Sequence, residues 1–149
     1  MSDDERGPSP EQLINTAALL GQAYSRLGHQ IVDGVIAAGF PQRPAHSGVF
    51  AHIDLEGTRL TVLAERANMT PQAMKDLVDD LVRLGYVSRR PDPTDGRAKL
   101  VTLTERGRAC IAASVEVIAG LERRLEALLG PEHLATMQDA LTRILRHHW

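Results

Sequence analysis

A cluster of small and polar residues at the start of one expected helix has the chemistry needed to read DNA bases: Thr70, Gln72, Ala73, Lys75 and Asp76. Glutamine can form a paired hydrogen bond with adenine, lysine can donate to guanine or phosphate, and a carboxylate can accept from the cytosine amino group. Threonine followed by Pro71 is typical of a helix start. We therefore expect these side chains on the exposed first turns of a helix, the end that enters the major groove in helix-turn-helix proteins.

Basic residues follow this helix at Arg89, Arg90, Arg97 and Lys99. Arg97 falls at the expected tip of a hairpin, where a guanidinium can enter a narrow minor groove. Asp95 is expected to hold that guanidinium in a bidentate pair. Arg89 and Arg90 are better placed to bind phosphates, which position a protein on DNA without specifying a sequence. The alternative is a charged hairpin that is only solvated surface.

The spacing of apolar residues predicts the elements that position these side chains. Residues 61–67 form one expected helix and residues 71–84 a second, ended by Gly85, with a buried stripe of Met74, Leu77, Val78, Leu81 and Val82. Residues 86–90 and 100–103 alternate as strands around a turn at 91–96, and residues 58–60 suit a brief third strand. A helix-turn-helix followed by a hairpin describes a winged helix, whereas the two helices alone would fit any αα-hairpin.

Residues 81–107 closely resemble the wing region of the MarR family of transcriptional regulators, through the run Leu81-x-x-Leu84-Gly85-Tyr86-Val87-x-Arg89, then Asp95-x-Arg97, then Leu103-Thr104-x-x-Gly107. Residues 63–67 resemble the first helix of that family's DNA-reading unit. The resemblance implies a homodimeric winged helix-turn-helix regulator, most often a repressor, which binds double-stranded DNA at a palindromic operator. The sequence departs from the family at Asp76 and Asp80, where arginine is frequent, so the operator sequence does not carry over.

The resemblance also implies a small, often aromatic or anionic, effector that binds between the dimer helices and the DNA-reading unit. His29, His46 and Phe50 are the residues expected to face that cleft. No cofactor is expected, and the six histidines form no dense ligand set for a structural metal. Cys110 is expected to be a buried, inert thiol, with a redox switch as the alternative.

Long helices on both sides of the DNA-reading unit predict a fold that is mainly α with a small β-wing (α+β). Residues 1–39 comprise a tail and a dimerisation helix capped at Ser9, with an apolar seam at Leu13, Ala17, Leu20, Tyr24, Leu27 and Ile31. Residues 44–107 are the winged helix-turn-helix domain, opening with a short helix at 45–55. Residues 104–149 are the C-terminal dimerisation helices, broken at 130–131. Alternatively, these seams pack only on the chain's own core.

Composition and charge further limit the possible functions of the protein. The net charge is −2, yet residues 59–108 hold ten basic and seven acidic side chains, so positive potential gathers on the DNA-reading unit. A single cysteine, no signal peptide and no apolar span predict a cytoplasmic protein with no membrane partner. No catalytic motif points to an enzyme. The alternative function is a winged-helix protein-interaction module without DNA binding. The acidic residues Asp76, Asp79 and Asp80 are consistent with this alternative.

Overall fold

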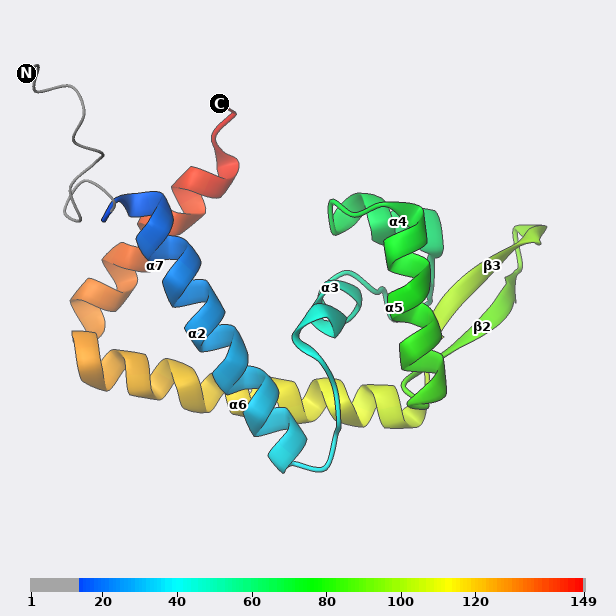
Figure 1. The fold of residues 1–149 in the computed structure, drawn as a ribbon, viewed down its shortest axis with the longest axis horizontal. Helices are drawn as coiled ribbons and strands as arrows, with labels where there is room; N and C mark the ends of the chain where they lie inside the picture. The colour runs from blue at the N-terminus through cyan, green and yellow to red at the C-terminus, as the bar shows by residue number, and fades with distance from the viewer. Residues whose placement is uncertain (1–13, 149) are drawn as a thin grey trace, which may run out of the picture.

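The chain folds as a set of helices with one small antiparallel sheet (Figure 1). The computed structural model describes residues 14–148. Their elements, in order, are α2 (Thr16–Ala37), η2 (Pro44–His46), α3 (Ser47–Phe50), β1 (Thr58–Arg59), α4 (Leu60–Arg66), α5 (Pro71–Arg83), β2 (Val87–Asp92), β3 (Asp95–Leu103), α6 (Glu105–Leu129) and α7 (Pro131–Arg146). The expected class, mainly α with a small β-wing, is confirmed.

Helix α6 connects the two ends of the molecule. It starts at the base of the wing, crosses α2 and leads into α7, so α2 and α7 lie at the end remote from the wing (Figure 1). The Thr104 side chain caps α6 by accepting from the Gly107 N–H at 3.0 Å. Gly34 marks a close crossing, because a Cβ there would lie 2.7 Å from a methyl carbon of Val117.

The two helices of the helix-turn-helix are α4 and α5. Asn68 adopts a positive φ of 52° in the tight turn between them, and Gly85 adopts a φ of 78° just beyond α5. The stripe predicted for α5 is buried at Met74, Leu77, Val78 and Leu81. Val82 differs from the expectation, because 38% of it is exposed on the shoulder of that stripe.

The wing is a sheet in the order β1-β3-β2, with both pairs antiparallel. The third strand expected near residue 58 is therefore present. The expected six-residue turn at 91–96 is wrong, because the strands continue to Asp92 and resume at Asp95. The shorter turn follows from Asp92, whose Oδ1 accepts hydrogen bonds from the Thr94 N–H and hydroxyl at 2.9 and 2.7 Å and so reverses the chain at once.

Two helices begin or end differently from their predictions. The Asn15 side chain caps α2 by accepting from the Ala18 N–H at 3.0 Å, so this helix starts at Thr16. The cap expected at Ser9 lies outside the described residues. The helix expected at 45–55 shrinks to η2 and the four residues of α3; the chain then leaves it for the turn that enters β1.

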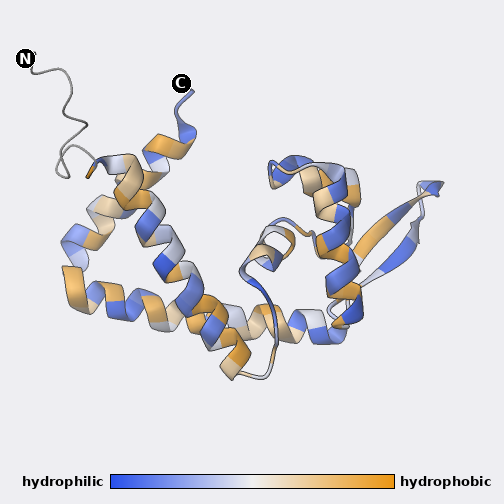
Figure 2. Cartoon of the chain, viewed as in Figure 1, coloured by the Kyte–Doolittle hydropathy of each residue, from blue (hydrophilic) through white to orange (hydrophobic). Residues whose placement is uncertain are grey.

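Apolar side chains remain exposed at the end of the molecule remote from the wing, where orange residues mark α2, α6 and α7 in Figure 2. The most exposed of them are Tyr24 (77%), Leu128 (78%) and Leu145 (85%). Exposed apolar side chains gathered on neighbouring elements are typical of an association surface. Within residues 14–148, no helix is long and apolar enough to cross a membrane.

Candidate nucleic-acid interface

The first turns of α5 carry the residues predicted to read base edges. The Thr70 side chain accepts from the Ala73 N–H at 3.2 Å and caps the helix as expected. Thr70, Gln72, Lys75 and Asp76 are exposed, and Ala73 is half-buried. Gln72 Nε2 donates to Asp76 Oδ1 at 3.0 Å, one helical turn away. A base contact by Gln72 must therefore rearrange or share this pair with Asp76.

Asp79 ties α5 to the wing. Lys75 Nζ donates to Asp79 Oδ2 at 2.8 Å, and Arg89 Nη2 donates to Asp79 Oδ1 at 2.5 Å. These two hydrogen bonds, that of Lys75 first, lower the pKa of Asp79 below its ordinary value. Arg89 is thus held against α5 from β2, whereas Arg90 is exposed. Contact of either arginine with phosphate stays a prediction.

A carboxylate that no sequence motif indicated anchors the wing tip. Asp92 is only 6% exposed, and its Oδ2 accepts from Arg59 Nε at 2.7 Å. The hydrogen bonds from Thr94, followed by that from Arg59, lower the pKa of Asp92 to about 2. Because Arg59 lies in β1 and Asp92 in β2, this ion pair joins the two edge strands across β3.

Asp95 acts on the wing tip differently from its prediction. Its Oδ1 accepts from the Arg97 backbone N–H at 3.1 Å, and its Oδ2 lies 4.0 Å from Arg59 Nη2. The expected bidentate pair between Asp95 and the Arg97 guanidinium is therefore wrong; the carboxylate shapes the backbone of the turn instead. Within residues 14–148 the Arg97 guanidinium has no carboxylate partner, so it projects unpaired from the tip.

A groove of about 320 Å³ runs between the wing and the start of α4. Its basic lining residues are Arg59, Arg89 and Lys99. Arg59 and Arg89 are already paired with carboxylates, whereas Lys99 is exposed without one in the described part of the chain. The groove therefore continues the basic surface of the wing toward the helix-turn-helix.

Asp80 lies one helical turn after Asp76 on α5, beyond the first turns that carry the residues predicted to read bases. Its carboxylate pairs with Arg43 and with Arg83, and the side chain is 18% exposed. His46 Nε2 lies 3.6 Å from Asp80 Oδ2, too far for a hydrogen bond. Two cations thus neutralise Asp80, which removes most of the repulsion that its position in the sequence predicted.

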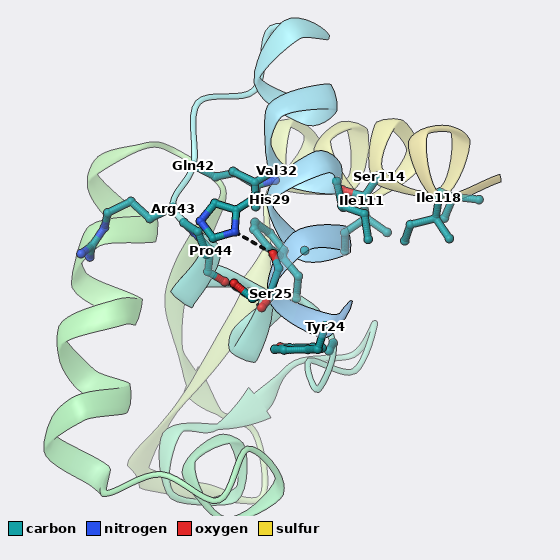
Figure 3. Close-up of a pocket in the computed structure, with 16 residues that line it drawn as sticks. Tyr24, Ser25, His29, Val32, Gln42, Arg43, Pro44, Ile111, Ser114 and Ile118 are labelled. Carbon is teal, nitrogen blue, oxygen red and sulfur yellow. Dashed lines mark hydrogen bonds between the residues drawn. The ribbon is translucent and has the colours of Figure 1, made fainter. Parts of the chain in front are cut away.

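A second cavity lies between α2, α6 and residues 42–51. It has a volume of about 470 Å³, and Figure 3 shows side chains from these elements converging on it. His29 and Phe50 line it as predicted, and His29 Nδ1 is 2.7 Å from the Ser25 carbonyl oxygen. His46 does not line it: it is 1% exposed, and its Nδ1 accepts from the Arg43 N–H at 3.1 Å.

A capped second helix, a tight turn before it and a three-stranded wing tied to it through Arg89 define a winged helix-turn-helix protein. Residues 42–98 match the model of the MarR family. Rv2887 of Mycobacterium tuberculosis, named as an HTH-type transcriptional repressor, is 37% identical over 67 residues, which cover 45% of this chain and 48% of that protein. The chain spans about half the length of the curated relatives it matches.

Solved structures share the whole architecture. The transcriptional repressor CouR bound to a 23-mer DNA duplex superimposes with a TM-score of 0.76 at 25% identity, covering 95% of this chain and 99% of that one. CouR bound to p-coumaroyl-CoA shares the fold with a TM-score of 0.77 at 23% identity, covering 96% of this chain and 100% of that one. The match to the MarR family model and the shared fold show that the chain is similar to these winged helix-turn-helix proteins.

Proposed function

We propose that this chain is a cytoplasmic, ligand-responsive transcriptional repressor that binds a palindromic DNA operator as a homodimer. The observation that carries the proposal is that the start of α5 and the wing tip point in the same general direction. Helix α5 ends and β2 begins at the same corner, near Gly85, so the start of α5 and the wing tip both point away from it (Figure 1). One duplex can then meet the start of α5 in its major groove and Arg97 in the adjacent minor groove.

The comparisons support this use of the surface. CouR, which has the same fold, was solved on a DNA duplex, and the mycobacterial relative is named as a repressor. The rival interaction module rested on the acidic residues of α5. Asp79 and Asp80 are each paired with two cations, which removes most of that support, whereas Asp76 is exposed and bonded to Gln72.

DNA binding is tested with a duplex selected by the wild-type protein from a random library, titrated at several salt concentrations. Arg97→Ala should weaken binding by about 1–3 kcal/mol and lower the salt slope by about one ion. Gln72→Ala should cost mainly at one base pair per half-site, with little change in that slope, because its amide is neutral. The control is Arg124→Ala, which removes the same charge from the exposed face of α6, remote from the wing. Wild-type affinity in Arg97→Ala at every salt concentration would refute the placement of the wing in the groove.

The exposed apolar side chains of the terminal helices support the homodimer. Leu145 is 85% exposed on α7, and burying it against a second chain would remove it from water. Leu145→Asp should therefore give a monomer by light scattering at micromolar concentration. Leu55→Asp is the matched control, because Leu55 is 74% exposed but lies in the loop before β1. A wild-type protein that is itself monomeric would contradict this part of the proposal.

The effector is proposed for the cavity between α2 and α6. Its volume of about 470 Å³ is in the range of small-molecule sites. Its walls are mostly apolar, with Tyr24 and Phe50 available for an aromatic ring and the main chain of Arg43 at one end. These features suit a small aromatic or anionic molecule, whose binding would lower DNA affinity. Ala51→Trp, which fills the cavity, should prevent such a ligand from releasing DNA.

A further inference from the structure

Residues 42–47 form a short segment with two sides, and each side meets a different region. On one side, Gln42, Arg43, Pro44 and Ser47 line the cavity between α2 and α6. On the other side, the Arg43 guanidinium bonds to Asp80 of α5. Figure 3 shows the labelled Arg43 side chain leaving the cavity toward the pale green helix. One segment therefore connects the cavity wall with the helix proposed to read DNA.

This segment is closed on itself by its own hydrogen bonds. The Arg43 N–H donates to His46 Nδ1 at 3.1 Å, and the Ser47 hydroxyl donates to the Pro44 carbonyl oxygen at 2.8 Å. His46 is buried, with 1% exposure, which fixes one end of the segment in the core. A displacement of Pro44 from the cavity side is therefore passed to Arg43, because the single turn η2 has little freedom to absorb it.

Asp80 is the place on α5 where that displacement would act. Its carboxylate holds Arg43 from the segment and Arg83 from its own helix. Loss of Arg43 would leave a poorly exposed carboxylate with one partner fewer, facing the buried His46 ring at 3.6 Å. Removing one partner of such a group costs free energy, so α5 would prefer a different position.

We propose that Arg43 and Asp80 are a positioning pair through which occupancy of the cavity changes the orientation of α5. The inference rests on the proposed function and assigns the regulation of that site to two residues. A ligand shifts such an equilibrium only if it binds the two arrangements unequally. A ligand that displaces Pro44 from the cavity side meets this condition, because residues 42–44 line the cavity and Arg43 also bonds to Asp80.

The test uses the full chain and the aromatic anion 8-anilinonaphthalene-1-sulfonate as the probe. Hydrogen exchange of the α5 amides is measured with and without the probe, in wild type and in Asp80→Asn, Arg43→Ala and Asp80→Glu. The matched control is Asp139→Asn, which alters an exposed ion pair with Arg143 on α7. Ala51→Trp, which fills the cavity, identifies the part of the response that comes from this site. The same variants are titrated with the selected duplex.

In wild type, the probe should change α5 exchange and DNA affinity by about fivefold or more, the lower end of ordinary coupling between sites. Asp80→Asn and Arg43→Ala should bind the probe as wild type within about twofold yet lose both responses, because probe binding alone shifts nothing without a coupled element. Asp80→Glu should restore them, and Asp139→Asn should keep them. A full α5 response in Asp80→Asn, or a bound probe that leaves wild-type α5 unchanged, would overturn the positioning role. Failure of the wild-type chain to bind any duplex would instead overturn the proposed function, since the exchange response needs no DNA.

Discussion

Replacing Gly107 with alanine tests how the wing is joined to helix α6. A Cβ at this position would lie 2.0 Å from the Tyr86 carbonyl oxygen and 3.2 Å from a methyl carbon of Leu103. The first distance is far inside van der Waals contact, and the atom it strikes is backbone. Alanine therefore forces the start of α6 away from the residue that leads into β2.

Moving the start of α6 away from Tyr86 would break three contacts made by Thr104. The Thr104 N–H donates to the Tyr86 carbonyl oxygen at 3.0 Å, the Thr104 hydroxyl donates to the Gly85 carbonyl oxygen at 2.6 Å, and its oxygen caps Gly107. Overpacking costs about 1–3 kcal/mol, and the lost cap and the two lost hydrogen bonds cost about 1 kcal/mol each. The expected loss is therefore about 4–6 kcal/mol, a large part of the roughly 5–15 kcal/mol that stabilises an ordinary domain.

The assay is urea unfolding followed by circular dichroism at one fixed protein concentration, because dimerisation adds to apparent stability. Gly120→Ala is the matched control on the same helix, where the nearest atom to an added Cβ is the flexible end of Arg123 at 3.8 Å. That variant should gain about 0.5–1 kcal/mol, since alanine is the better helix former. Equal unfolding midpoints for Gly107→Ala and wild type would refute the close approach of α6 to Tyr86.

Three further predictions concern single side chains. Because the pKa of Asp92 is lowered to about 2 from 3.8, its stabilising effect should be complete above about pH 4 and lost as the pH falls toward 2; the difference in urea midpoint between wild type and Asp92→Asn should shrink over that interval. Burial lowers the pKa of His46 from 6.5, so stability should decline as the pH drops below that value, and His46→Gln should flatten this slope. Cys110→Ser should leave DNA binding intact, because the thiol is buried and burial raises its pKa; peroxide-triggered DNA release that the serine variant loses would contradict this.

Local chemistry made the helix-turn-helix predictable from the sequence. The Thr70 cap and the apolar spacing of α5 act within a few residues of each other, and both are present. The turn at the wing was harder, because proline and glycine around it suggested a long loop. The Asp92 carboxylate accepts hydrogen bonds from the Thr94 N–H and hydroxyl, and these bonds shorten that loop. A local hydrogen bond thus decided a boundary that composition alone placed wrongly.

Contacts between distant residues could not be predicted in the same way. Arg59 and Asp92 are 33 residues apart in the sequence, and Arg43 and Asp80 are 37 apart. No sequence motif indicates that either pair is in contact. For the same reason His46 was expected in the effector cleft, whereas it lies buried behind the cavity wall. Sequence patterns identified these side chains as polar, but only the fold determines which of them meet.

The arrangement of charges explains how a chain with a net charge of −2 can present a basic surface to DNA. Two carboxylates near the proposed interface are paired with basic side chains of the same chain, Asp79 with Lys75 and Arg89, and Asp92 with Arg59. Three cations of the wing have no carboxylate partner within residues 14–148: Arg90, Arg97 and Lys99. Phosphates would therefore meet unpaired cations rather than the chain's average charge, and the field of a charge weakens within a Debye length of about 8 Å at physiological salt. Asp79 and Asp80 can thus fix the position of α5 against the wing and residues 42–47 without opposing the approach of DNA.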